Sequence, residues 1–187
     1  MKNIIFIIIT VLLFLSCATI KSKATMGYDL VSWGSSVSTV KNIYNICDDI
    51  QPKTSPNAPD MLELKQENFS DIIFSRTFIF FENKLVIVLI VYNDKSDDNL
   101  RKIQAELENK FGGVTDIEED LTDIIATKTL SFSQHSPELL VKLTYGIDQK
   151  SEIINGILVS YFWEKGIGEY LKSFKMILSS LQRKTNK

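Results

Sequence analysis

The stretch Phe78–Tyr92, FIFFENKLVIVLIVY, determines what kind of fold the rest of the chain can form. It places two apolar runs on either side of Glu82-Asn83-Lys84, where Asn83 tolerates a positive φ angle. β-Branched and aromatic residues dominate both runs, and this composition favours strands. The second run, Leu85–Tyr92, is continuously apolar, which is typical of a central strand covered on both faces or deeply buried. The stretch therefore predicts a buried antiparallel hairpin.

An amphipathic helix is predicted upstream of this hairpin. Apolar residues recur at three- and four-residue spacing over Val37–Ile50. Ser35-Ser36 supplies a natural N-cap, and the helix must end before Pro52 because the residue preceding a proline disfavours the α region. Cys47 falls within the apolar stripe, so we expect it to be a buried small hydrophobe rather than a reactive thiol.

Two further helices are predicted downstream. One begins near Ser96, where Asp97 and Asp98 suit the positive end of the helix dipole, and it ends at Gly112-Gly113. Another extends from about residue 168 to residue 183, with an apolar stripe on one side and a basic tail after it.

Strand patterns occur before and after the second of these helices. Residues 52–60 indicate a loop, and an extended segment near Met61–Lys65 precedes the hairpin. The acidic residues 116–123 are expected to form a solvated loop. Three strand candidates follow, and the middle one alternates well enough to predict one wet face. They are Ile124–Phe132, Leu139–Ile147 and Ile153–Trp163.

The predicted order is helix, strands, helix, strands, helix. Hairpin-connected strands grouped between helices predict an α+β fold with a largely antiparallel sheet and three helices. Each half of the chain shows a helix followed by strands, which hints at an internal duplication. A mature length near 170 residues is enough for one ordinary hydrophobic core, and it predicts one domain.

The first residues are typical of a bacterial export signal. Met1-Lys2-Asn3 is a short positive region, and Ile4–Leu15 is an apolar run that is too short to span a bilayer but has the length of a secretory signal core. We therefore expect residues 1–16 to be a signal peptide, residues 17–27 a lipidated tether, and residues 28–187 a single α+β domain.

The end of this segment, Phe14-Leu15-Ser16-Cys17, resembles a lipobox, the motif at which bacteria attach diacylglycerol to a cysteine and cleave before it. The resemblance implies that Cys17 carries the lipid and anchors the chain to a membrane of the cell envelope, facing the periplasm or the cell exterior. Cleavage after Ala18 or Ala24, giving a secreted protein, is the alternative. With lipid on Cys17, Cys47 is left without an intrachain partner.

A second resemblance covers residues 33–92. Residues 33–92 resemble small envelope lipoproteins of the BamE-like kind in two motifs. These are the turn Trp33-Gly34-Ser35-Ser36 before a helix and the hairpin turn Phe81-Glu82-Asn83-Lys84-Leu85. That group has a "Gly-small-Ser/Thr" turn and an "aromatic-x-Asn-x-Leu" turn at these places. The resemblance implies a small α+β domain that binds partner proteins at the outer membrane or, in related folds, inhibits an enzyme.

No catalytic, metal or cofactor site is predicted. The single histidine, His135, lies in a turn, and no Gly-x-Ser-x-Gly elbow accompanies it. One histidine and one remaining cysteine do not make a zinc site. Asp94–Asn99 begins like a calcium loop but lacks the glycine and the final acid, so N-capping explains it better. A formal net charge of −2 without a basic block gives no footprint for nucleic acid.

Trp33 and Trp163 lie at the ends of predicted elements, where they either close the core or line a ligand groove, and core closure is the favoured interpretation. These observations lead us to expect a non-enzymatic lipoprotein that binds a protein partner in the envelope through an exposed apolar patch or sheet edge. The alternative is a carrier of an apolar small molecule or lipid, which requires a cavity between the sheet and the final helix.

Overall fold

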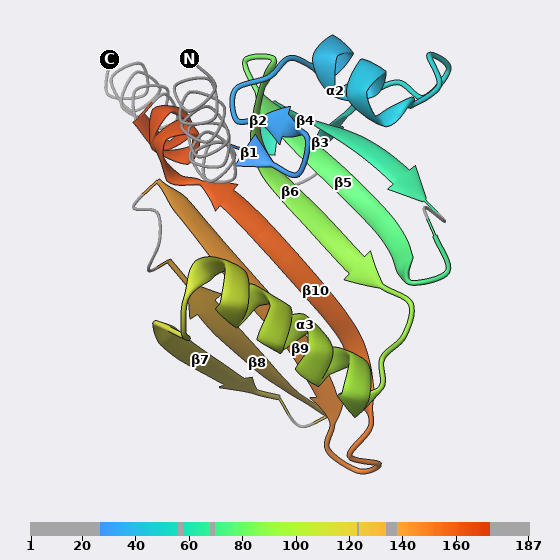
Figure 1. The fold of residues 1–187 in the computed structure, drawn as a ribbon, viewed down its shortest axis with the longest axis vertical. Helices are drawn as coiled ribbons and strands as arrows, with labels where there is room; N and C mark the ends of the chain where they lie inside the picture. The colour runs from blue at the N-terminus through green and yellow to red at the C-terminus, as the bar shows by residue number, and fades with distance from the viewer. Residues whose placement is uncertain (1–26, 56–57, 68–69, 123, 134–137, 173–187) are drawn as a thin grey trace, which may run out of the picture.

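The computed structural model describes residues 27–55, 58–67, 70–122, 124–133 and 138–172 (Figure 1). Its main feature is an eight-stranded antiparallel sheet in the order β3-β4-β5-β6-β10-β9-β8-β7, so the predicted α+β class with an antiparallel sheet is confirmed. The strands are β3 (Lys53–Ser55), β4 (Ala58–Glu67), β5 (Ile73–Phe81), β6 (Lys84–Tyr92), β7 (Asp116–Leu121), β8 (Ile125–Phe132), β9 (Leu139–Asp148) and β10 (Ile154–Trp163).

The two halves of the chain have the same topology. Helix α2 (Val37–Tyr44) precedes the meander β3 to β6, and helix α3 (Asp97–Phe111) precedes the meander β7 to β10. The last strands of the two meanders pair antiparallel at the centre of the sheet, where Val88 lies opposite Tyr161. The strand order therefore reads outward from the centre in the same way on both sides.

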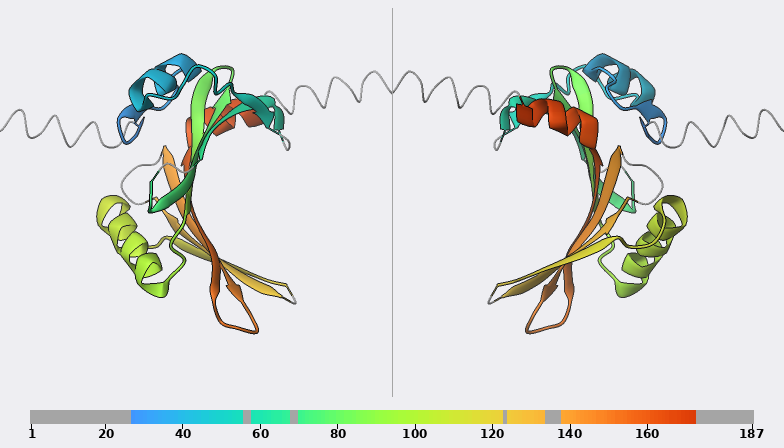
Figure 2. Two further views of the ribbon diagram at one scale, coloured as in Figure 1. Left: turned by 90° about the vertical axis from the view of Figure 1, so that its right-hand side faces the viewer. Right: turned by 90° about the vertical axis from the view of Figure 1, so that its left-hand side faces the viewer.

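Both helices lie on the same side of the sheet. Figure 2 shows a curved sheet with α2 and α3 against its convex side. The core fills the space between these helices and the sheet, and it draws on both halves of the chain, so the halves share one hydrophobic interior. Its largest fully buried members are Val31, Val40, Leu64, Phe78, Phe80, Leu85, Val88, Phe132, Val141, Leu143 and Ile157.

The predicted order of elements is wrong at its beginning, because the described chain starts with two short strands rather than a helix. β1 (Gly27–Tyr28) and β2 (Val31–Ser32) form a two-stranded hairpin outside the main sheet. Strands of two residues are too short to leave a periodic pattern. What holds the hairpin is packing on the convex side, where the ring of Tyr28 meets Tyr161 edge-on at 4.9 Å.

Helix α2 is shorter than predicted, and the expected burial of Cys47 is wrong. Ser36 is the N-cap, as expected, but Asn45 ends the helix in the left-handed region with φ 51°. The Ile46 N–H then donates to the Lys41 carbonyl oxygen at 2.9 Å. Ile46 is buried after this turn, whereas Cys47 is exposed. An asparagine C-cap therefore overrides the apolar spacing that continues beyond it.

The acidic residues 116–123 are not the predicted loop. Residues 116–121 form β7, the edge strand that pairs with β8 along its whole length. Charged side chains on an edge strand discourage the sheet from pairing with another chain. The remaining strand predictions in this half, and α3 between its Ser96 N-cap and its Gly112 C-cap, are confirmed within a few residues.

The hairpin of Phe78–Tyr92 is formed as predicted. Glu82 and Asn83 have φ angles of 48° and 60°, the conformation of a two-residue turn that matches strand twist. The Asn83 Oδ1 accepts a hydrogen bond from the Val37 N–H at 3.1 Å. The Gly34 N–H donates to the Leu85 carbonyl oxygen, and the Leu85 N–H donates to the Ser35 carbonyl oxygen, both at 2.9 Å. The turn before α2 and the hairpin turn are therefore joined directly.

A third helical segment begins at residue 164, directly after β10 and four residues before the predicted start. It is described as far as residue 172 and lies at one end of the concave side of the sheet (Figure 2). Tyr170 meets the Phe81 ring edge-on at 5.3 Å. Below it lies a second, smaller cluster of buried side chains formed by Met61, Ile79, Phe81 and Val86. The rest of the predicted helix lies outside the described residues.

Candidate functional site

Among the described residues, the helical residues 164–172 cover the concave side of the sheet at only one end (Figure 2). β6 occupies the predicted central position, yet only part of it is covered on both faces. Val86 is buried at the covered end, whereas Ile87, Leu89 and Val91 are partly exposed on the concave side. The prediction that Leu85–Tyr92 is covered on both faces is thus wrong for these three residues.

An apolar stripe occupies the middle of this concave face. Strand register places Ile87 opposite Phe162 and Phe162 opposite Leu140, and four residues farther along the strands it places Val91 opposite Leu158. Between these two levels Leu89 lies opposite Ser160, which is buried. All of these apolar side chains are partly exposed. A contiguous apolar area of this kind on a protein surface is typical of an interaction site. The apolar stripe consists of Ile87, Leu89, Val91, Leu140, Leu158 and Phe162.

Hydroxyl side chains border the apolar stripe on β8 and β9. Thr144 lies opposite Leu158 on one side and opposite Thr129 on the other, and the hydroxyl oxygens of Thr144 and Thr129 are 3.0 Å apart. Thr127 continues this border along β8, whereas Ser131 of the same face is buried. Short hydroxyl side chains both donate and accept hydrogen bonds, so this band can satisfy polar groups of whatever covers the stripe.

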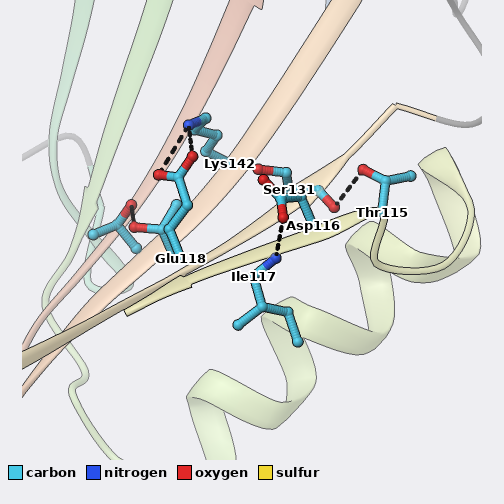
Figure 3. A network of polar contacts seen from close by, with 8 residues as sticks. Thr115, Asp116, Ile117, Glu118, Ser131 and Lys142 are labelled. Atoms are coloured by element: carbon cyan, nitrogen blue, oxygen red, sulfur yellow. Dashed lines mark hydrogen bonds and ion pairs between the residues drawn. The ribbon is translucent and has the colours of Figure 1, made fainter. Parts of the chain in front are cut away.

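An acidic row borders the hydroxyl side chains at the edge of the sheet. Asp116, Glu118 and Asp120 of β7 lie opposite Ser131, Thr129 and Thr127 and therefore face the concave side. Figure 3 shows Ile117 on the side of the sheet where α3 lies and the Glu118–Lys142 pair on the other side. The Lys142 Nζ lies 3.3 and 3.4 Å from the two carboxylate oxygens of Glu118.

The other half of the concave face is balanced in charge. Register places Lys53 opposite Glu63, and Lys65 and Glu67 lie two and four residues farther along β4 on the same face. The Lys65 Nζ lies 2.7 Å from a Glu67 carboxylate oxygen. The concave face is consequently apolar at its centre, neutral toward β3 and acidic toward β7.

Asp148 adds a further negative charge at the tip of the hairpin between β9 and β10. Hydrogen bonds from the Ser151 backbone N–H, the Ser151 hydroxyl and the Lys150 N–H hold the pKa of the Asp148 carboxyl below its usual range. Register places Asp148 opposite Ile125 at the end of the hydroxyl band. The carboxylate therefore stays charged throughout the neutral range.

The residues singled out for chemistry do not converge on one site. Cys17 and His135 lie outside the described residues. Trp33 packs against the core on the convex side, whereas Trp163 packs against the smaller cluster on the concave side. The two tryptophans thus help to close two clusters, which confirms the preference for core closure over a shared ligand groove.

The segment Asp94–Asn99 caps a helix, as predicted. The Ser96 hydroxyl oxygen accepts from the Asn99 N–H at 3.2 Å, and the Asp94 Oδ1 accepts from the Ser96 N–H at 2.9 Å. Within the described ranges, no group of three or more histidine, cysteine, aspartate and glutamate side chains could hold a metal ion. In the same part of the chain, no helix is long and apolar enough to cross a membrane.

Comparison of the chain with protein-family models, curated proteins and solved structures finds no match. The concave face itself is the feature that the sequence interpretation missed. One signal of the concave face was present in the sequence, because the alternation in β9 predicted one wet face. The structure confirms this alternation: Leu139, Val141 and Leu143 are buried, and Leu140, Lys142 and Thr144 are partly exposed.

Proposed function

We propose that this chain is a membrane-anchored lipoprotein of the bacterial cell envelope whose domain binds another protein, without catalysis, through the concave face. The apolar stripe carries this proposal, since the central strands are partly exposed there and the described helical residues 164–172 cover only one end of the face. Surfaces that are apolar at the centre and polar at the rim are typical of protein–protein interfaces.

The shape of the face supports a protein over a small molecule. Small apolar ligands are held in enclosed cavities that cover most of their surface, whereas this face belongs to a curved sheet that the described helical residues cover at one end (Figure 2). At the covered end, Gly166 packs so closely that a Cβ there would overlap the Trp163 ring and lie 2.7 Å from Val86. The helical segment is therefore seated directly on the sheet at this point, which argues against the alternative of a lipid carrier.

The envelope location is proposed from the N-terminal sequence. Cys17 precedes the first described residue, Gly27, by ten positions, and a chain of that length reaches at most about 35 Å. The domain would then stay close to the membrane surface. The resemblance of residues 33–92 to BamE-like lipoproteins belongs to the same proposal, and the direct hydrogen bonds between its two motifs support it.

Site-specific crosslinking in the native host tests the binding face. A photoreactive amino acid in place of Thr144, which lies beside the apolar stripe, should form an adduct with one defined protein. The same group in place of Leu30, which is 73% exposed in the β1–β2 turn, should not. Adding Leu158→Lys should remove the adduct at position 144 by placing a charge in the stripe, and an unchanged adduct would contradict the proposal.

The anchor is tested separately by Cys17→Ser. This substitution should move the protein from the detergent phase to the aqueous phase without changing its thermal unfolding, because it removes acyl chains that each contribute about 0.8 kcal/mol per buried CH₂ group to membrane binding. Intact mass gives the second measurement: unmodified protein cleaved after Ala18 or Ala24 would show a secreted protein instead.

A further inference from the structure

The two flanks of the apolar stripe differ in charge. Toward β3, Lys53 and Lys65 balance Glu63 and Glu67. Toward β7, the described residues that strand register places on the concave face comprise the three acids of the acidic row, Asp148 and one cation, Lys142. Lys150 adds a second cation in the turn next to Asp148, so acids still outnumber cations there. A protein lying across the stripe therefore meets one neutral flank and one negative flank.

Ion pairs among the described residues do not neutralise the negative charge toward β7. Lys142 is engaged with Glu118, the middle member of the acidic row. Lys128 of β8 pairs with Glu119 at 2.9 Å, but alternation places that pair on the opposite face of the strand. In the described part of the chain neither Asp116 nor Asp120 forms an ion pair. The Asp116 Oδ1 accepts a hydrogen bond from the Ile117 backbone N–H at 2.9 Å, but this donor is uncharged and does not neutralise the carboxylate.

We infer that the partner of the concave face presents lysine or arginine side chains beside an apolar ridge, positioned to meet Asp116 and Asp120; this inference rests on the proposed function. Residues two apart on a strand are separated by about 6.8 Å, so the Cα atoms of Asp116 and Asp120, four residues apart, are about 14 Å apart. A partner without cations there would partly desolvate both carboxylates with no compensation, which is unfavourable. Complementary charges also accelerate association and fix the orientation in which the partner docks.

The experiment uses envelope membranes from the native host that contain the full chain with the photoreactive group at position 144. The adduct yield is measured from 50 to 500 mM NaCl in the parent and in two doubly substituted variants. Asp116→Asn with Asp120→Asn removes two charges from the acidic row. Glu106→Gln with Glu108→Gln removes two charges from exposed positions of α3 on the convex side and is the matched control.

We expect the Asp116→Asn, Asp120→Asn variant to give about one tenth of the parent's adduct yield at 50 mM NaCl. The Glu106→Gln, Glu108→Gln control should give the same yield as the parent. At 500 mM NaCl the difference between the acidic-row variant and the parent should shrink, because salt screens the charges. The crosslinked peptide, sequenced by mass spectrometry, should be rich in lysine or arginine. An adduct of undiminished yield, or one with an acidic peptide, would overturn this inference and leave the proposed function standing.

Other occupants of the face give different products. An adduct of twice the chain mass would show a second copy of this protein, and an intramolecular product with residues 173–187 would show that the chain covers its own concave face. Either product would overturn the inference. The absence of any adduct at position 144 would contradict the proposed function itself, so the two failures are distinguishable.

Discussion

Asn83 shows how one residue can serve two elements. Its φ of 60° shapes the β5–β6 turn, and its side-chain oxygen accepts a hydrogen bond from the first residue of α2. We expect Asn83→Ala to lower the free energy of unfolding by about 2 kcal/mol, because it removes a helix cap and strains the left-handed backbone. Asn83→Gly keeps the turn and loses only the cap, so it should cost about half as much in urea denaturation. Equal losses would show that the turn conformation contributes nothing.

Tyrosines on the convex side give a pH dependence. Burial raises the pKa of Tyr92 to about 12, and it also raises the pKa values of Tyr28, Tyr44 and Tyr161. These folded-state values exceed the unfolded value near 10, so their stabilising contribution is complete below pH 10 and is lost as pH rises through 12. Urea denaturation should show constant stability at pH 7–9 and a decrease between pH 10 and 12, in step with tyrosinate absorbance. Ionisation near pH 10 without loss of stability would contradict this expectation.

The ends of the helices show which features could be predicted from single residues and which could not. Ser36 and Ser96 were predicted as caps because hydroxyl side chains satisfy free N–H groups at helix starts wherever the tertiary structure places them. Asn45 was missed as a C-cap because Ile46, Cys47 and Ile50 continue the apolar spacing past it. Only the left-handed φ at Asn45 shows that the helix has ended.

The helical segment at residues 164–172 offers a matched pair of substitutions. A Cβ at Gly166 would overlap the Trp163 ring, whereas a Cβ at Gly168 would meet no atom within 4 Å. Gly166→Ala should destabilise the protein by about 2 kcal/mol, because overpacking displaces the segment from the sheet. Gly168→Ala should stabilise it by up to about 1 kcal/mol through helix propensity. Urea denaturation distinguishes the two, and similar effects at both positions would show that the segment does not pack on Trp163.

Elements with strong patterns were predictable, and those determined by their neighbours were not. The alternation of β9 and the apolar run of β6 identified both strands, and Gly112 marked the end of α3. β7 resembles a loop in sequence because its six residues are all exposed, and only pairing with β8 makes it a strand. The acidic row was therefore visible as a cluster of acids but not as one edge of a face.

At the scale of the whole molecule, the two similar halves should unfold together. Leu64 in β4 and Leu143 in β9 are fully buried in the same core although they belong to different halves. Leu64→Ala and Leu143→Ala should each lower the free energy of unfolding by about 3 kcal/mol. Native-state hydrogen exchange should show the same loss of protection for the slowest amides in both halves. A loss confined to the substituted half would show that the halves unfold independently.

The overall arrangement was only partly contained in the sequence. Grouped strands between helices predicted the α+β class, and the recurrence of a helix followed by strands suggested two related halves. The pairing of β6 with β10, which joins those halves into one curved sheet, depends on contacts about 70 residues apart that no local pattern records. The concave face follows from that pairing and so became visible only in the structure.

The central pairing also determines how the protein responds to dilution. If the two four-stranded halves were separate subunits, they would form a dimer by pairing strands such as β6 and β10. That dimer would be in equilibrium with monomers, and the face across its interface would be lost at low concentration. Here residues 93–96 tether β6 to the start of α3, so the second half is always present at a high local concentration. A single copy therefore keeps the whole face intact at any dilution.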